Sequence, residues 1–359
     1  MEKDRTNRRT IYRNIMKELK ILTVFPCDTY YTWQVQLWLE SLRAINQSDK
    51  AVILIFIPKG RVDNPKWNMI IPLYPEVEWK FYRDEHDIRG EIGVYIPIIR
   101  PYTLWRYFMD SPEMVNKAIF YCDCDILFKE NFNIDKFLDD DINYLSDTNG
   151  YINASYFDRK VNDVKPEMLE EYKKIDVLQE ATSLVGINRQ IAEANNMHSG
   201  GAQYLLKNIN ADFWLKVKKD TLLIRVYLQG INRKYFESEK KGFQSWVSDM
   251  WGVLWGLWAA GKETRIIPEL NFSHATDRME RVNQCPIFHN AGISSDFYKI
   301  DDNRNYPCFY KGKYHRGNID PTKDPHLDVI LNNEESKKHG TWYYVSKLDE
   351  LRNKYNLNY

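Results

Sequence analysis

Apolar, strand-like runs alternate with helix-patterned segments in the first third of the chain, and this alternation constrains the fold most strongly. The clearest run is AVILIFIP (51–58), a continuous β-branched stretch that ends in proline and suits a parallel strand covered on both faces. Further strand-like runs lie at 19–28, 77–84 and 117–128, and helical spacing of apolar residues lies at 32–45 and 100–111. This order predicts an α/β fold with a mainly parallel central sheet flanked by helices.

The second half of the chain is less regular. Residues 243–262 are apolar on nearly every face and predict a buried helix. Residues 300–340 are polar and predict an ordered loop, so we expect an irregular C-terminal extension. Further elements are expected as a strand and helix in 200–221, strands followed by loops in 265–277 and 285–293, and a closing helix in 342–357.

Composition bounds the class of protein. The chain has 359 residues with 43% apolar and 14% aromatic content, which favours a folded globular protein. Its formal net charge is zero, so no whole-molecule field attracts it to nucleic acid or to an anionic membrane. The five cysteines are odd in number and scattered, which suits a reduced protein better than a disulfide scaffold. With no bilayer-length apolar segment and a charged start, we expect a cytoplasmic protein without a membrane partner.

The stretch FYCDCDILF (120–128) ends an apolar run with two aspartates and two cysteines. On a strand, Asp123 and Asp125 would share one face, and Cys122 and Cys124 the other. Zinc would need ligands from both faces, and no second cysteine pair lies at zinc-site spacing. Two carboxylates at one sheet edge suit Mg²⁺ or Mn²⁺, which would bridge to a diphosphate. The alternative, that the aspartates cap a turn or pair with Lys or Arg, stays open on this motif alone.

The context of the motif favours a metal site. Both FPCD (25–28) and CDCD (122–125) fall at predicted carboxyl ends of strands, where ligands bind in parallel sheets. A later loop, FHNAGI (288–293), follows another apolar run and holds His289 and Gly292 in a His-x-x-Gly arrangement. A lone histidine is commonly structural, but an imidazole beside a glycine that lets backbone approach a phosphate suits a third metal ligand.

The order of these segments resembles the nucleotide-sugar domain of GT-A glycosyltransferases, most closely the glycogenin and bacterial galactosyltransferase type, family eight. That family places an Asp-x-Asp after a helix and an apolar strand, then an Asn-x-Gly or Ser-Gly loop, an acidic helix start and a late His-x-x-Gly. The matching segments, within residues 19–293, are CDCD (122–125), HSGGAQYLL (198–206), SDMWGVLW (248–255) and HNAG (289–292). The family's Lys-Pro-Trp after the histidine loop is absent, Lys299 being the nearest lysine, and Met250 replaces the usual Gln.

The resemblance implies a GT-A (Rossmann-like) fold and a division of the chain into four parts. These are a charged arm or helix at 1–18, a nucleotide-sugar-binding half at 19–150, an acceptor and catalytic half of the same unit at 151–299, and a C-terminal loop and helix at 300–359.

The resemblance also assigns roles to individual residues. Asp123 would touch the ribose and the metal, Asp125 would chelate the metal, and His289 would complete the ligands of Mn²⁺ or Mg²⁺. Donor contacts would come from Pro26, Cys27 and Asp28 at the base, from Ser199, Gly200, Gly201 and Gln203 under the sugar, and from Gly292.

Three assignments have structural alternatives. Arg100 and Arg106 would contact the diphosphate or the sugar, or would form a solvated helix face. Asp249, with Gln203, is the candidate catalytic residue, or it is an acid stabilised by the helix dipole. Trp246 and Trp251 would form an acceptor platform or pack in the core.

We therefore predict a metal-dependent glycosyltransferase that moves a sugar from a nucleotide sugar, in particular a UDP-sugar, to a hydroxyl. Segments 198–208, 244–258 and 288–293 also look like phage-encoded glycosyltransferases, which implies a hydroxymethylated DNA base as acceptor and a host-cytoplasm location. The basic, aromatic stretches 231–243 and 311–317 would hold phosphates, or are solvated loops. The alternatives are a glycan, lipid-linked sugar or protein hydroxyl as acceptor, and a non-catalytic nucleotide- or glycan-binding module.

Overall fold

The computed structural model describes residues 17–85, 95–301 and 305–355, so most of the predicted N-terminal arm lies outside the described residues. A seven-stranded sheet runs through the molecule in the order β3-β2-β1-β4-β7-β6-β8. Its strands are β1 (Leu19–Pro26), β2 (Ala51–Ile57), β3 (Glu78–Arg83), β4 (Ala118–Cys122), β6 (Asn143–Asp147), β7 (Gly200–Lys207) and β8 (Thr264–Ile266). The pairings β3–β2, β2–β1, β1–β4 and β6–β8 are parallel, and β7 is antiparallel to β4 and β6. The predicted α/β fold with a mainly parallel sheet is confirmed.

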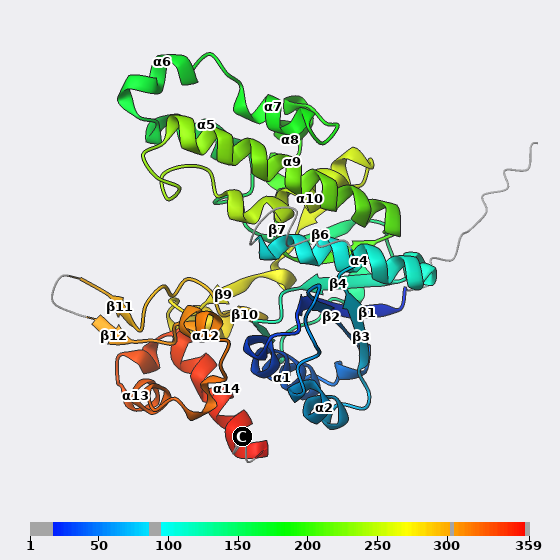
Figure 1. Ribbon diagram of the computed structural model, residues 1–359, viewed down its shortest axis with the longest axis vertical. Coiled ribbons are helices and arrows are strands. Elements are labelled where there is room, and N and C mark those ends of the chain that lie inside the picture. The colour runs from blue at the N-terminus through cyan, green and yellow to red at the C-terminus, as the bar shows by residue number, and fades with distance from the viewer. Residues whose placement is uncertain (1–16, 86–94, 302–304, 356–359) are drawn as a thin grey trace, which may run out of the picture.

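Helices cover both faces of this sheet, as Figure 1 shows. Successive strand residues face opposite layers, so Ile21 packs in one core and Leu22 in the other. The Ile21 layer holds α1 (Thr29–Ala44) and α2 (Lys66–Ile70), and the Leu22 layer holds α4 (Ile99–Asp110), α9 (Ala211–Tyr235) and α10 (Ser248–Ala259). Because apolar side chains meet helices on both sides, the strands read as continuous apolar runs in the sequence.

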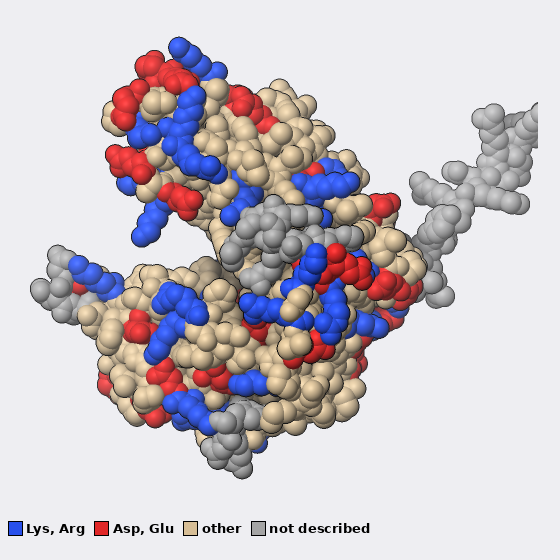
Figure 2. All heavy atoms as spheres, in the orientation of Figure 1, with Lys and Arg blue, Asp and Glu red and all other residues tan. Residues whose placement is uncertain are grey.

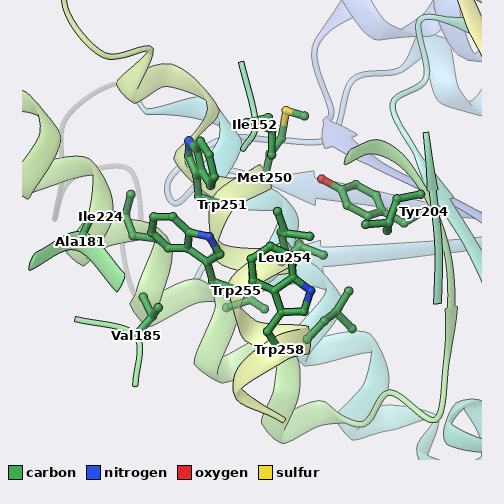
Figure 3. Close-up of a cluster of buried hydrophobic side chains, with 14 of the residues drawn as sticks. Ile152, Ala181, Val185, Tyr204, Ile224, Met250, Trp251, Leu254, Trp255 and Trp258 are labelled. Carbon is green, nitrogen blue, oxygen red and sulfur yellow. The ribbon is translucent and has the colours of Figure 1, made fainter. Parts of the chain in front are cut away.

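Helix α10 is the buried helix expected in 243–262. Every residue from Ser248 to Trp258 is buried, and its tryptophans lie among side chains of α7, α9 and β7 in Figure 3. Gly252 allows close packing on α9, because an added Cβ would lie 2.6 Å from the Thr221 hydroxyl oxygen. The helix thus anchors the residues at its N-terminus, including Asp249, against the sheet.

The prediction of a single strand at 117–128 is wrong. Strand β4 ends at Cys122, and a turn leads to β5 (Ile126–Phe128), which belongs to a different sheet. In that sheet β5 is antiparallel to β10 (Ile287–His289), and β10 is parallel to β9 (Phe272–His274). The break places Asp123 and Asp125 on the turn between the two sheets.

Residues 300–340 are also not the loop expected from their polarity. They contain helices α12 (Lys311–Gly317) and α13 (His326–Asn332), between a hairpin and the closing helix α14 (Gly340–Tyr355). The hairpin consists of β11 (Phe297–Lys299) and β12 (Asn305–Pro307). Sparse apolar side chains such as Tyr314 and Leu327 form a core with Trp33 of α1, and this core fixes α12 beside the carboxyl end of β1.

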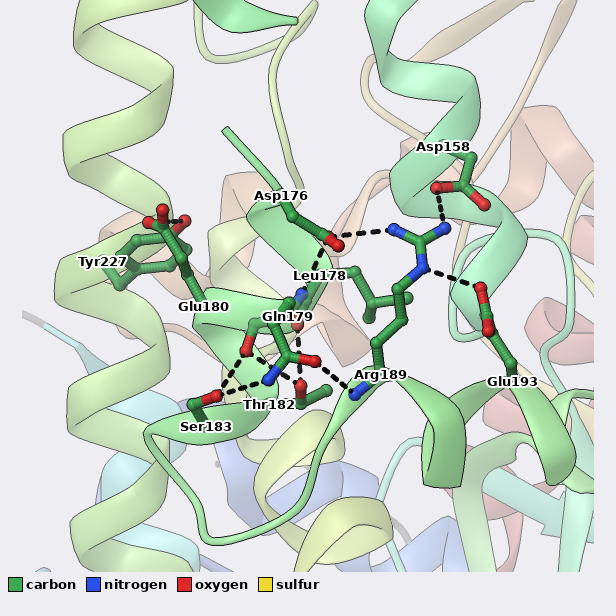
Figure 4. A network of polar contacts seen from close by, with 10 residues as sticks. All are labelled: Asp158, Asp176, Leu178, Gln179, Glu180, Thr182, Ser183, Arg189, Glu193 and Tyr227. Atoms are coloured by element: carbon green, nitrogen blue, oxygen red, sulfur yellow. Dashed lines mark hydrogen bonds and ion pairs between the residues drawn. The ribbon is translucent and has the colours of Figure 1, made fainter. Parts of the chain in front are cut away.

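Short helices join the sheet to α9 and flank β10: α5 (Ala154–Arg159), α6 (Leu169–Tyr172), α7 (Val177–Ser183), α8 (Arg189–Ala194) and α11 (Met279–Gln284). The carboxylate of Asp176 caps α7 by accepting a hydrogen bond from the Gln179 amide. Arg189 ties three of these segments together through ion pairs, drawn in Figure 4. Among the described residues, no helix is both long enough and apolar enough to span a bilayer.

Candidate donor and metal site

The turn between β4 and β5 presents two aspartates toward a cavity and buries the neighbouring cysteines. Cys122 and Cys124 are 1% and 5% exposed, and burial raises the pKa of both thiols. Asp123 and Asp125 line the cavity. The predicted separation of carboxylates from thiols is wrong for Cys124, which lines the cavity together with Asp123 and Asp125, because residues 123–125 form a turn and do not alternate as on a strand. Only Cys122, the last residue of β4, is absent from the lining.

Strand β10 brings His289 to this turn. In the β10–β5 pairing His289 lies opposite Ile126, and the Asn290 amide donates a 2.9 Å hydrogen bond to the Asp125 carbonyl. One ligand atom each from Asp123, Asp125 and His289 lie within 4.8 Å of one another. The structure therefore gathers the three residues predicted as metal ligands, which are separated widely in the sequence.

These three residues fit a divalent cation. Oδ1 of Asp125 and Nδ1 of His289 are buried without a hydrogen-bond partner, and the Nε2 atom of His289 lies 3.4 Å from that Oδ1. Buried polar atoms are normally paired, so these two unpaired atoms indicate room for a ligand. Carboxylate oxygens with an imidazole nitrogen suit Mn²⁺ or Mg²⁺ better than a soft metal.

Arg100 of α4 connects Asp123 to Asp249. Its guanidinium forms an ion pair with Asp123, and its Nη2 lies 2.6 Å from Oδ2 of Asp249. Burial and the charge of Asp123 raise the pKa of Asp249, and Arg100 opposes this shift. Asp249 is 6% exposed and is not among the described residues that line the cavity. This position favours a role in holding Arg100 over direct contact with a substrate.

Lys311 contacts Asp125 from the first residue of α12. Burial alone would raise the pKa of Asp125, but the charges of Lys311 and His289 outweigh it and hold the pKa below its ordinary value. The resemblance pointed to Lys299 as the nearest lysine after the histidine loop, yet Lys299 lies exposed on β11. The signal for Lys311 in the sequence was only its place in the basic stretch 311–317.

The site opens into a cavity of about 360 Å³ at the carboxyl ends of β1 and β4. Of the predicted donor residues, Pro26, Arg100 and Asp123 line it. Helices α1 and α12 add aromatic and polar side chains to the wall. Lys311 and His315 were marked in the sequence only as members of the basic stretch 311–317, and Tyr30, Tyr31 and Gln34 were not marked at all. Tyr30, Tyr31 and Gln34 of α1 belong to no motif, so the sequence did not mark them.

Three predicted donor contacts lie outside the lining of this cavity. The Cys27 side chain is buried, burial raises its pKa to about 11, and its carbonyl accepts a hydrogen bond from the Trp67 indole at 3.1 Å. Asp28 stands at the start of α1, with an Arg61 nitrogen 3.5 Å from its carboxylate. The Arg106 side chain on α4 is 24% exposed and donates to Glu85 at 3.1 Å.

The Ser199–Gln203 segment is packed inside the protein. Gln203 is fully buried, and its Oε1 accepts a 2.6 Å hydrogen bond from the Ser146 hydroxyl of β6. A Cβ at Gly200 would lie 2.3 Å from the Ser146 carbonyl oxygen, and one at Gly201 would lie 2.6 Å from the Tyr204 hydroxyl. The close approach is therefore to the neighbouring strand β6 at Gly200, and to side chains of β7 and α10 at Gly201. None of the four predicted residues lines the cavity.

The remaining candidates, Gly292, Trp246 and Trp251, differ in their position relative to the cavity. Gly292 adopts φ +91°, a left-handed conformation that favours glycine, in the turn after His289. Trp246 is 56% exposed and lines the cavity, whereas Trp251 is 1% exposed and packs on Trp255 with ring centroids 4.7 Å apart. Of the two tryptophans, only Trp246 is placed to contact a bound molecule.

No protein-family model matches the sequence, and no curated protein matches it. Among solved structures, the chain is similar to the bifunctional glycosyltransferase WbbM, with 10% identity and a TM-score of 0.44 over 94% of this chain and 52% of that one. It thus spans about half of the WbbM chain. It is also similar to the galactosyltransferase LgtC in complex with donor and acceptor sugar analogues (12% identity, TM-score 0.38, 78% of this chain and 90% of that one). A third similar structure is mouse xyloside xylosyltransferase 1, with 10% identity and a TM-score of 0.35 over 76% of this chain and 97% of that one.

Proposed function

We propose that this protein is a metal-dependent glycosyltransferase of GT-A type that uses a nucleotide sugar, in particular a UDP-sugar. One observation carries the proposal: Asp123, Asp125 and His289 converge within 4.8 Å beside a cavity at the carboxyl ends of parallel strands. Ligands of open α/β sheets bind at this edge. The cavity volume of about 360 Å³ falls in the range of small-molecule sites.

The charges around the cavity suit a diphosphate. Asp123, Asp125 and His289 would hold Mn²⁺ or Mg²⁺, which when bound neutralises negative charge on the diphosphate leaving group. Arg100 and Lys311 line the same cavity and add fixed positive charge where the diphosphate oxygens would lie. The rings of Tyr30 and Tyr31 offer apolar faces for the nucleoside.

A screen of nucleotide sugars tests the donor. Thermal unfolding is measured with Mn²⁺ and each nucleotide sugar in turn, and we expect one UDP-sugar to raise the midpoint because it binds the folded state. The same donor should be hydrolysed slowly in the presence of Mn²⁺. Asp125→Ala should abolish this hydrolysis, and unchanged turnover in that variant would refute the metal site. Binding without hydrolysis or transfer to any acceptor would instead identify a non-catalytic binding module.

For the acceptor we propose a hydroxymethylated base, of the hydroxymethylcytosine type, in phage DNA. Two observations favour a polyanion here. First, helix α12 brings His315 to the cavity and exposes Arg316 beside it. Second, Figure 2 shows a hollow between the part formed by α5–α10 and the part formed by α12–α14, with Lys and Arg side chains on both sides. Trp246 at the cavity mouth offers a face on which an extruded base would stack.

Transfer of labelled sugar distinguishes the acceptors. We expect label to enter hydroxymethylcytosine DNA and not unmodified DNA of the same sequence. Equal lack of label in both would reject DNA. Label on a glycan, a lipid-linked sugar or a protein hydroxyl would keep the reaction and replace the acceptor.

A further inference from the structure

Asp123 and Asp125 of the metal site are each paired with a basic side chain. The two basic side chains differ in whether they would keep a carboxylate partner once a metal ion bound. Arg100 contacts Asp249 as well as Asp123, so it keeps a carboxylate partner when Asp123 turns to a metal ion. Lys311 forms its ion pair with Asp125, and within the described ranges this is its ion-pair partner. When a metal ion binds Asp125, the Lys311 ammonium therefore loses the carboxylate that neutralises it.

That exchange is unfavourable for a metal ion alone. The side chains of Lys311 and Asp125 are only 27% and 12% exposed, so water screens their charges weakly. A divalent cation on Asp125 would face the Lys311 ammonium at short range, and like charges repel. If the ammonium moved away, it would lie partly buried without a counter-ion, which is costly.

A diphosphate in the cavity removes this cost. Lys311 and Gly312 line the same cavity as Asp123 and Asp125, so a phosphate oxygen there lies within reach of the ammonium. The four-carbon stem of lysine lets the ammonium change partner without a movement of the helix. The negative charge that Asp125 withdraws from Lys311 is then supplied by the donor.

We propose that Lys311 is an internal counter-ion that holds Asp125 until a divalent cation and a diphosphate bind together, and that it thereby couples their binding. The inference rests on the proposed function, since it takes the cavity as the donor site. By linkage, UDP should raise the affinity for the metal by the same factor by which the metal raises the affinity for UDP.

The test is a titration of Mn²⁺, with free Mn²⁺ followed by electron paramagnetic resonance, in the absence and presence of saturating UDP. In the wild-type protein UDP should tighten Mn²⁺ binding about tenfold or more. Lys311→Met should bind Mn²⁺ alone about tenfold more tightly than wild type. UDP should still tighten Mn²⁺ binding in this variant, through direct attraction between the ion and the diphosphate, but by a smaller factor than in wild type. Lys311→Arg, which keeps the charge, should restore most of the coupling.

Lys313→Met is the matched control. Lys313 lies on the same helix but pairs with Asp324 at 2.6 Å, away from the metal ligands, so this variant should retain wild-type coupling. Wild-type Mn²⁺ affinity and coupling in Lys311→Met would overturn the counter-ion role and leave the donor site standing. Failure of the wild-type protein to bind Mn²⁺ at all would overturn both the metal site and this inference. Thermal unfolding of each variant confirms that it is folded.

Discussion

Arg100 and Arg189 each gather carboxylates, yet they do so in opposite surroundings. Arg189 lies among three carboxylates, with Asp158 at 2.7 Å, Asp176 at 2.9 Å and Glu193 at 2.7 Å, and these partners are about half exposed (Figure 4). Arg100 has two carboxylate partners, Asp123 and the buried Asp249. Arg100 itself also lines the cavity. By number of ion pairs, Arg189 would be the more notable residue.

The difference shows which features indicate a site. The Arg189 cluster joins α5, α7 and α8 at the surface, where water screens each ion pair and the net stabilisation is small. The Arg100 cluster borders a cavity, and Asp249 and Arg100 each keep a buried polar atom without a hydrogen-bond partner. Unpaired polar atoms beside a cavity, more than the number of ion pairs, mark the place where a ligand completes the structure.

The largest expected effect is that of Arg100→Met. The variant removes the positive charge between Asp123 and Asp249, and we expect kcat/KM for sugar transfer to fall about a thousandfold, or about 4 kcal/mol of transition-state stabilisation. Steady-state kinetics with the identified donor measure this loss. If a folded Arg100→Met protein transferred sugar within twofold of the wild-type rate, the Arg100 cluster would have only a structural role, like the Arg189 cluster.

Asp249→Asn should have a smaller effect, because Asp123 still holds Arg100. For a positioning residue we expect about a tenfold loss, about 1.4 kcal/mol, chiefly as a raised KM for the donor. A loss of a thousandfold or more in kcat with unchanged KM would instead assign Asp249 to acid–base catalysis, as the sequence resemblance implied. The split between kcat and KM therefore sharpens what the Arg100 cluster does.

Asp176→Ala tests the other side of the comparison. This carboxylate caps α7 and pairs with Arg189, so its loss should lower the free energy of unfolding by about 1 kcal/mol. Transfer kinetics should be unchanged, because Asp176 does not line the cavity. Denaturant unfolding and the transfer assay are run on the same preparation, and a tenfold loss of transfer would contradict a purely structural cluster.

Arg189→Met should have the smallest effect. Its partners are exposed and already solvated, so we expect the free energy of unfolding to fall by about 0.2–1 kcal/mol and transfer to stay at the wild-type rate. If this variant lost as much activity as Arg100→Met, the distinction drawn between the two arginines would be wrong.

Local sequence signals predicted much of the fold because they depend on near neighbours. The continuous apolar run at 51–58 became β2, and the all-round apolar segment at 243–262 became α10. The break in 117–128 was not predictable in this way, since β5 forms only by pairing with β10, far along the chain. Helices α12 and α13 were missed because their few apolar residues gain stability from a core shared with α1.

The candidate site was predicted in part for the same reason. Asp123, Asp125 and His289 were identified because their residue types carry metal-binding chemistry wherever they meet. The segment from Ser199 to Gln203 was predicted to lie under the donor sugar, but a glycine pair indicates only close approach. Here the neighbours are protein atoms: β6 at Gly200, and side chains of β7 and α10 at Gly201. Lys311 was not distinguished from other lysines, since its significance lies entirely in its contact with Asp125.

By itself the sequence determined an α/β protein with a mainly parallel sheet, cysteines that pack in the interior, and carboxylates that follow a central strand. These properties follow from hydrophobic periodicity and side-chain chemistry, which act locally. Only the tertiary structure decided which charges face each other. The pairs Arg100–Asp123 and Lys311–Asp125 join distant segments, and electrostatic contact depends on separation in space, which a linear sequence does not record.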